Sequence, residues 1–261
     1  MKIVFDIGGT NMRIAAVQNG TLGEIRKVLT PQDYDETLRV FVVGAKELAA
    51  GDVIESAAGC IAAQIDTERG MYDANNRPAW NGRHFNTDLA ALLNAPVFVA
   101  NDCQVIALGE LAFGAGKGSR RLAYVTVSTG VGAGLVVDGM IAQTSGFHFG
   151  HEIVNGLELE ALISGTAVKK KFGIEPKDLA SLEERTALAD VLARGLVKII
   201  SEWQPDTIVI GGSMIVGVNP IPLDRVKETL GTLVAESPAL KMAETGDSGG
   251  LYGGIVLGAQ H

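Results

Sequence analysis

The sequence predicts an α/β protein built from two similar lobes. Strand-like apolar runs alternate with segments of helical periodicity along the 261 residues, which is the pattern of layered α/β folds. A strand, a glycine turn and a second strand open the chain, and the same order returns from Leu122. Glycine is also frequent, with 33 residues against an average usage of about 7%, and it gathers where apolar runs end. We therefore expect two lobes with a ligand-binding cleft between them.

The charge and composition of the chain argue against several classes of protein. The net charge is −8 and Lys169, Lys170 and Lys171 form the only basic cluster, whereas a nucleic-acid groove needs positive charge to release counterions. No apolar run approaches the roughly 18 residues of a membrane span, and the N-terminus lacks the apolar block of a secretory signal. Two cysteines are too few for a disulfide framework. We expect a cytoplasmic protein with no nucleic-acid or membrane partner.

The first hundred residues predict a sheet with helices packed on it. Residues 2–6 are typical of a buried strand, and residues 13–17 of its hairpin partner. Residues 34–50 carry apolar side chains at three- and four-residue steps, which predicts a helix. Short strands are expected at residues 53–58 and in "PVFVA" from Pro96. The polar segment "DANNRPAWNGRHFN" between them predicts a loop.

The remainder of the chain repeats this design. A helix, "CQVIALGELAFG", follows Asp102, and then come the strand "LAYVTVS", the turn "TGVGAG" and the strand "LVVDG". A long helix is expected over residues 182–203 because its apolar side chains recur at helical steps. The strand "PDTIVI" then leads into a Gly-Gly turn. The recurrence of strand, glycine turn and strand indicates an internal repeat of pattern, not of identity.

The two glycine turns are candidates for binding phosphate. A strand that ends in "GGTN" exposes consecutive backbone N–H groups and a hydroxyl, and "STGVGAG" offers the same donors. Neither turn matches a P-loop, and strands follow both turns where a dinucleotide fingerprint requires a long helix. Two such turns suggest that the chain holds the phosphates of a nucleotide from both halves.

The order of six motifs resembles the ROK family (repressors, open reading frames, kinases). The motifs are "DIGGTN", "NDCQVIALGE", "VSTGVGAGLVVDG", "GFHFGHE", "GLELEALISGTA" and "IVIGGSM", and they run from Ile3 to about Gly258. The family contains ATP-dependent sugar kinases, so the resemblance implies a two-lobed actin-like ATPase (ribonuclease H-like) fold with a central interdomain cleft. The N-terminal lobe would comprise residues 1–100 and about 245–261, and the C-terminal lobe residues 101–244.

The resemblance also implies a site for MgATP. Asp6 would place the Mg²⁺ through water. The other residues form a first phosphate turn (Gly8, Gly9, Thr10 and Asn11), a second phosphate turn (Thr129, Gly130 and Gly132) and a turn under the adenosine (Gly211 and Gly212). Polyphosphate is an alternative donor, and "IVIGGSM" favours a nucleotide.

Asp102 matches the catalytic base of the family. A carboxylate can take the proton of a sugar hydroxyl as the hydroxyl attacks the γ-phosphorus. The alternative is structural, because Asn and Asp are favoured at helix N-caps and both Asn101 and Asp102 stand between a strand and a helix. The resemblance favours the base for Asp102 and a sugar contact for Asn101.

The expected sugar pocket departs from the family pattern. His148 stands where the family's "GExGH" carries glutamate, while His151 and Glu160 match further sugar contacts. The resemblance adds Gly59 and Asn76 to the substrate-binding residues. A neutral imidazole both donates and accepts a hydrogen bond, whereas a carboxylate only accepts. N-acetylmannosamine kinases of bacteria share the His-x-Gly-His pattern, so an N-acetylated hexosamine and a plain hexose both stay open as substrates.

The family's zinc element is missing, and other readings remain. The interval "EIVNGLEL" after His151 has no cysteine, so we expect no structural zinc.

Trp80, four residues after Asn76, either covers the sugar site or fixes a long loop. A sugar-responsive regulator and an actin-like structural ATPase are alternatives to a kinase. The regulator would lack a DNA-binding module, since a strand begins at Lys2. A homodimer is expected from the family alone.

Overall fold

The computed structural model describes residues 1–66, 70–72, 74, 77–144 and 148–261. The chain divides into two compact units: unit 1 is Met1–Ala112 with Asp247–His261, and unit 2 is Phe113–Gly246. The resemblance implies a second lobe of residues 101–244, whereas helix α3 (Asp102–Phe113) lies in unit 1 but for its last residue. Gly109 of α3 explains this placement, because a Cβ there would come within 2.5 Å of the Gly249 carbonyl oxygen.

The centre of unit 1 is a five-stranded sheet of order β3-β2-β1-β4-β7. Its strands are β1 (Lys2–Ile7), β2 (Asn11–Gln18), β3 (Thr21–Leu29), β4 (Ser56–Ile61) and β7 (Val97–Asn101). Strands β1, β2 and β3 are antiparallel neighbours, whereas β1, β4 and β7 run parallel. The carboxyl ends of these three parallel strands therefore share one edge of the sheet.

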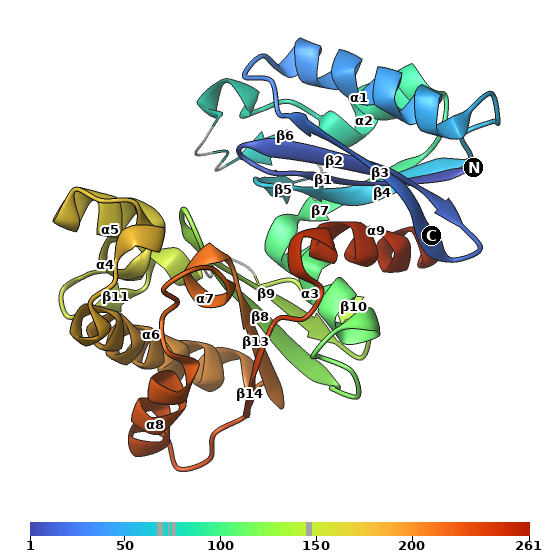
Figure 1. The fold of residues 1–261 in the computed structure, drawn as a ribbon. Coiled ribbons are helices and arrows are strands. Elements are labelled where there is room, and N and C mark those ends of the chain that lie inside the picture. Colours follow the sequence, from blue (N-terminus) through green and yellow to red (C-terminus); the bar gives the residue numbers. More distant parts are fainter. Residues whose placement is uncertain (67–69, 73, 75–76, 145–147) are drawn as a thin grey trace. The chain divides into compact units, whose positions relative to one another are not determined.

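Helices cover both faces of this sheet (Figure 1). Helices α1 (Tyr34–Ala49) and α2 (Phe85–Leu93) cover one face, where the Phe5 ring meets Phe41 edge to face and Phe85 at a tilt. Helices α3 and α9 (Gly249–Ala259) lie on the other face. The smaller elements are β5 (Gln64–Asp66), β6 (Gly70–Tyr72), η1 (Pro78–Trp80) and η4 (Gly246–Ser248).

Unit 2 repeats the arrangement with a sheet of order β10-β9-β8-β13-β14. Its strands are β8 (Arg121–Val127), β9 (Val131–Val137), β10 (Met140–Ile141), β13 (Thr207–Gly211) and β14 (Ala239–Met242). The first three strands in the chain are antiparallel neighbours and the next two run parallel to the first, as in unit 1. The internal repeat expected from the sequence is thus confirmed.

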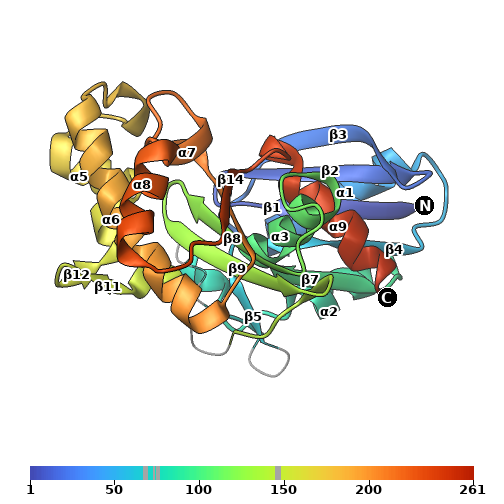
Figure 2. The same ribbon diagram turned by 90° about the horizontal axis from the view of Figure 1, so that it is seen from below.

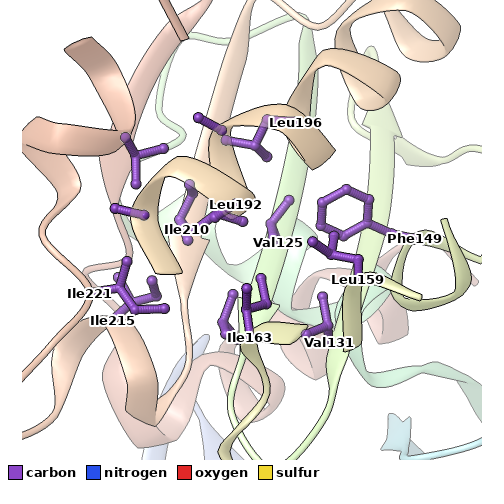
Figure 3. Close-up of a cluster of buried hydrophobic side chains, with 14 of the residues drawn as sticks. Val125, Val131, Phe149, Leu159, Ile163, Leu192, Leu196, Ile210, Ile215 and Ile221 are labelled. Atoms are coloured by element: carbon purple, nitrogen blue, oxygen red, sulfur yellow. The ribbon is translucent and has the colours of Figure 1, made fainter. Parts of the chain in front are cut away.

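A large apolar core lies between the sheet and the helices of unit 2. The helices are α4 (Leu159–Ile163), α5 (Gly165–Phe172), α6 (Leu182–Trp203), α7 (Ser213–Val216) and α8 (Leu223–Leu233). Figure 3 shows Leu192 and Leu196 of α6 packed against Val125 and Ile210 of the sheet. The short elements η2 (Phe149–His151), η3 (Pro176–Asp178), β11 (Ile153–Val154) and β12 (Leu157–Glu158) complete the unit, and Figure 2 shows β11 and β12 beside α6. In the described part of the chain, no helix combines the length and apolarity that crossing a bilayer requires.

Candidate active site

The carboxyl edge of the unit 1 sheet gathers polar side chains on adjacent strands. Asp6 of β1 pairs in register with Cys60 of β4, and Cys60 pairs in turn with Ala100 of β7. Asn101 ends β7 and Asp102 begins α3 directly after it. Parallel β-strands of α/β proteins commonly bind ligands at this edge.

Asp6 is a mostly buried carboxylate with one cation beside it. Its side chain is 14% exposed, and Arg13 Nη1 lies 3.4 Å from Asp6 Oδ2. The Cys60 thiol donates a hydrogen bond of 3.4 Å to Asp6 Oδ1. Burial raises the pKa of Asp6 from 3.8 to about 6; the positive charge of Arg13 opposes this rise, whereas the negative charges of Asp102 and Asp247 add to it. The burial of Asp6 therefore favours a cation near its carboxylate, because a cation would offset the cost of burying the charge.

Asp102 is the first residue of α3, and Asn101 precedes it at the end of β7. The Cys103 N–H donates to Asp102 Oδ1 at 2.8 Å and to Asn101 Oδ1 at 3.0 Å. Asn101 is buried and its amide nitrogen donates to the Ala63 carbonyl at 3.1 Å. The structure thus gives Asn101 structural bonds on both sides of its amide. Burial raises the pKa of Asp102, and the hydrogen bonds from Cys103 oppose that rise.

The first glycine turn (residues 8–11) joins β1 to β2. Its carbonyl groups accept hydrogen bonds from Thr30 and Arg77, which lie on one side of the turn. The Thr30 hydroxyl donates to the Gly8 carbonyl at 2.9 Å, and the Thr30 N–H donates to the Thr10 carbonyl at 3.0 Å. Arg77 Nη1 donates to the Gly9 carbonyl at 2.9 Å. The chain has no cis peptide bond among the described residues, and in a trans peptide the N–H points opposite to the C=O. The N–H groups of Gly9 and Thr10 therefore point away from Thr30 and Arg77.

The second glycine turn (residues 128–132) joins β8 to β9 in unit 2, and its carbonyls are also bonded from behind. The Gly165 N–H donates to the Ser128 carbonyl at 2.7 Å, and the Thr166 hydroxyl donates to the Thr129 carbonyl at 2.8 Å. Both donors belong to the first turn of α5. By the same peptide geometry, the N–H groups of Thr129 and Gly130 point away from that helix.

The Gly-Gly turn after β13 lies beside the second glycine turn within unit 2. Gly211 pairs in register with Thr126 near the end of β8, and Gly212 has a φ of +91°. A Cβ on Gly212 would collide with the Val127 carbonyl oxygen and lie 2.7 Å from Thr126 Oγ1. Glycine is thus required here by conformation and by space.

Glu160 and the two histidines predicted to contact the sugar also belong to unit 2. Glu160 Oε2 accepts a hydrogen bond of 2.8 Å from the Val131 N–H, so Glu160 lies against the second glycine turn. The rings of His148 and His151 meet edge to face with centroids 5.9 Å apart. His151 Nδ1 lies 3.2 Å from Glu158 Oε1, and both of these side chains are about half exposed.

Comparison with known proteins identifies the family. The ROK family matches residues 2–261, nearly the whole chain. The chain belongs to the ROK family. The N-acetylgalactosamine kinase AgaK of Shewanella sp. (strain ANA-3) is 25% identical over an alignment that covers 97% of this chain and 95% of AgaK.

Solved structures of other ROK proteins show the same fold. A ROK hexokinase from Thermus thermophilus superposes with a TM-score of 0.85 and 24% identity, covering 99% of this chain and 98% of that one. A ROK glucokinase from Streptomyces griseus, solved in complex with glucose and AMPPNP, gives a TM-score of 0.84 and 22% identity over 100% and 99% of the two chains. The actin-like ATPase fold expected from the sequence is confirmed.

The other residues expected from the ROK pattern are placed as follows. Gly59 lies in β4, where a Cβ would collide with the Phe5 backbone, so close packing alone requires a glycine. Gly132 lies in β9, opposite Thr126. Asn76 lies outside the residues that the structure describes. Trp80 is 2% exposed and donates from Nε1 to the Gln32 carbonyl at 3.0 Å, which favours its role in fixing a loop.

Several residues around Asp6 and the first glycine turn are not among the site residues that the sequence of this ROK protein predicts. Arg13 bonds Asp6 and also lies 2.7 Å from Asp247, which follows it by 234 positions. Thr30 and Arg77 bond the turn from distant loops. Only Arg13 carried a signal, because β1 and β2 form a hairpin that places it opposite Asp6.

Proposed function

We propose that this ROK protein is an ATP-dependent sugar kinase that transfers the γ-phosphate of MgATP to a hydroxyl of a hexose or an N-acetylhexosamine. The observation that carries the proposal is the carboxyl edge of the unit 1 sheet. There, Asp6 and Asp102 lie next to a turn whose N–H groups point away from its bonded carbonyls. The relatives support the reaction class, since they include an N-acetylgalactosamine kinase and a glucokinase solved with glucose and AMPPNP.

Asp102 is assigned the role of the general base. The raised pKa of its carboxyl makes it a better proton acceptor than an exposed aspartate. The Cys103 N–H on Oδ1 fixes the carboxyl group at the first turn of α3, so that its orientation does not depend on substrate. Asp102 takes the proton from the sugar hydroxyl during attack on the γ-phosphorus. Asn101 is assigned a sugar contact beside it, through the second N–H and the second lone pair that its two structural bonds leave unused.

Asp6 fits a Mg²⁺ ion held through water. Mg²⁺ prefers oxygen ligands and retains several of its waters, and a buried carboxylate with a raised pKa gains most from a nearby cation. When bound, Mg²⁺ neutralises charge that develops on the phosphates. The N–H groups of Gly9 and Thr10, together with the Asn11 side chain, are assigned to phosphate oxygens in unit 1.

Unit 2 is assigned the remaining contacts. The N–H groups of Thr129 and Gly130 are donors to phosphate, with Gly132 beside them. The turn of Gly211 and Gly212 is assigned to the adenosine, because it lies next to the second glycine turn along the sheet edge.

The sugar contacts of unit 2 are proposed for His148, His151 and Glu160, with Gly59 and Asn76 as further substrate residues of unit 1. Two imidazoles with centroids 5.9 Å apart can donate as well as accept hydrogen bonds. Such a pair suits an acyl-amino group, whose carbonyl oxygen needs a donor. We therefore favour an N-acetylhexosamine over a plain hexose. A homodimer is proposed from the family alone.

The test is a coupled assay of ADP production. The purified protein is given MgATP with glucose, mannose, allose, fructose, N-acetylglucosamine, N-acetylmannosamine or N-acetylgalactosamine. In a parallel series polyphosphate replaces ATP, and the sugar phosphate is measured directly because transfer from polyphosphate releases no ADP. We expect one sugar to support turnover. With it, Asp102→Asn should lower kcat by about 10²-fold or more, the scale of a lost general base, while ATP affinity stays within a few-fold.

The matched control is Asp138→Asn, the same isosteric change at a surface aspartate that is 60% exposed and bonded to Arg120. Its kcat should equal that of the wild type. Turnover of Asp102→Asn close to the wild-type value would show that another group accepts the proton. ADP release that does not depend on added sugar would show that the protein is an ATPase and not a sugar kinase.

A further inference from the structure

Arg77 is a buried cation that bonds three backbone carbonyl groups. The residue is 6% exposed. Its Nη1 donates to Gly9 at 2.9 Å, its Nη2 to Thr30 at 2.9 Å and its Nε to Pro31 at 3.0 Å. A guanidinium group presents its donors in a rigid planar fork, so these three bonds fix the first glycine turn against the loop at residues 30–31.

The charge of Arg77 has no ion-pair partner in the described part of the chain. Its guanidinium donates to the three carbonyls and lies over the ring of Trp80, whose centroid is 4.9 Å from the Arg77 Cζ. Burial lowers the pKa of Arg77, yet a guanidinium stays protonated in proteins. A full positive charge therefore lies next to the turn, on the side to which the Gly9 carbonyl points.

The bond to Gly9 fixes the direction of one peptide unit. Because the peptide is planar and trans, holding the Gly9 carbonyl towards Arg77 directs the Thr10 N–H to the opposite side. Arg77 also bonds the Thr30 carbonyl, and Thr30 in turn donates to the carbonyls of Gly8 and Thr10. Arg77 thus fixes both the turn and the residue that supports it.

We propose that Arg77 is a positioning residue for the phosphates of the nucleotide. It holds the Gly9–Thr10 peptide with its N–H directed outward, and its charge strengthens the attraction of that N–H for a phosphate oxygen. This inference rests on the proposed function. In unit 2, the equivalent carbonyls of Ser128 and Thr129 accept from the first turn of α5, namely from the Gly165 N–H and from the N–H and hydroxyl of Thr166. Backbone donors there take the place that the Arg77 side chain has in unit 1.

Lysine cannot replace Arg77 in this role. An ammonium group is a compact charge whose donors diverge from one nitrogen, whereas the three carbonyls are bonded by three separate nitrogens of the guanidinium. Arg77→Lys therefore keeps the charge but loses the geometry, and Arg77→Ala loses both.

The experiment measures kcat and the KM for ATP and for the sugar in both variants, with thermal unfolding as a check on folding. Arg83 supplies the matched control, because it is an exposed arginine of the same segment whose guanidinium lies over the Tyr34 ring at 4.8 Å. Arg83→Lys and Arg83→Ala should behave as the wild type. The Arg77→Ala protein is also assayed with added guanidinium chloride at low millimolar concentration, against methylammonium chloride at the same ionic strength.

We expect kcat/KM for ATP to fall by about 10- to 100-fold in Arg77→Lys and by more in Arg77→Ala, the range that follows from losing a hydrogen bond to a charged group. The KM for the sugar should change less than threefold, and guanidinium, unlike methylammonium, should restore part of the lost activity. A general loss of structure would change both KM values and would not respond to guanidinium.

Two results would overturn the inference. One is a kcat/KM for ATP within twofold of the wild type in folded Arg77→Lys. The other is an equal loss in the Arg83 variants. If the wild type phosphorylates a sugar and the Arg77 variants do so equally well, this inference is overturned and the proposed function is not. Wild-type protein that neither phosphorylates a sugar nor binds ATP overturns both.

Discussion

Replacing Asp6 by asparagine should make the ligand-free protein more stable at neutral and basic pH. The folded chain raises the pKa of Asp6 from 3.8 to about 6, chiefly by burial. Between about pH 4 and pH 6 the folded state therefore holds a proton that the unfolded chain has released, and so the free energy of unfolding falls as the pH rises through this window. This rise in the pKa of Asp6 lowers the free energy of unfolding above pH 6 by about 3 kcal/mol. Asparagine resembles the protonated acid, and Arg13 keeps Asp247 as a partner.

The assay is urea unfolding followed by tryptophan fluorescence at pH 8 and at pH 4.5, without Mg²⁺ or nucleotide. At pH 8 we expect Asp6→Asn to exceed the wild type by about 3 kcal/mol, and at pH 4.5 most of this difference should vanish because the wild-type carboxyl is then protonated. The same variant should lose phosphoryl transfer, since it can no longer hold Mg²⁺ through water as a carboxylate.

The matched control is Asp247→Asn, which removes the same charge from the second partner of Arg13. Asp247 is 82% exposed, and exposed ion pairs contribute at most about 1 kcal/mol, so its stability should change little at either pH. An Asp6→Asn protein that is no more stable than the wild type at pH 8 would refute the reasoning. A gain of equal size at pH 4.5 would refute it as well, because the gain would then not come from ionisation.

Two further predictions concern catalysis and the adenosine turn. Because the pKa of Asp6 is about 6 in the free protein, kcat/KM for MgATP at saturating sugar should fall about tenfold per pH unit below pH 6; a profile that stays level down to pH 5 would contradict this. Gly212→Ala should weaken ATP binding by more than about tenfold and lower the unfolding temperature, since its φ of +91° and the Thr126 hydroxyl at 2.7 Å leave no place for a Cβ. Calorimetric titration with ATP measures the first effect, and unchanged affinity would show that the turn does not contact the nucleotide.

Most of the fold could be predicted from patterns of neighbouring residues in the sequence. The two strand–turn–strand segments and the helix at residues 182–203 were predictable because period and glycine position are properties of neighbouring residues. Strand β3 was missed because its inner and outer positions do not alternate cleanly and every one of its residues is at least partly exposed. The unit to which α3 belongs was also beyond the sequence, since it depends on contact between Gly109 and α9, about 140 residues later.

The site residues divide in the same way. The turns and Asp102 follow strands directly, so motif order was enough to select them as candidates. Arg77 lies in a loop whose composition is merely polar, and its carbonyl partner Gly9 is 68 positions away. A backbone carbonyl leaves no mark in the sequence of its donor, and for this reason no pattern could have paired them. The raised pKa of Asp6 likewise depends on burial by distant segments such as α9, whose Gly250 packs against it.

The two glycine turns occupy equivalent positions in the repeated sheets, yet different groups hold them. In unit 2, the donors behind the turn are mainly the N–H of Gly165 and the hydroxyl of Thr166 at the start of α5. The backbone donor there persists whatever side chain is substituted. In unit 1, the central carbonyl depends on one guanidinium that also adds a buried charge. The first turn should therefore be the more sensitive of the two to a single substitution, and that substitution lies outside the six motifs that carry the resemblance to the ROK family.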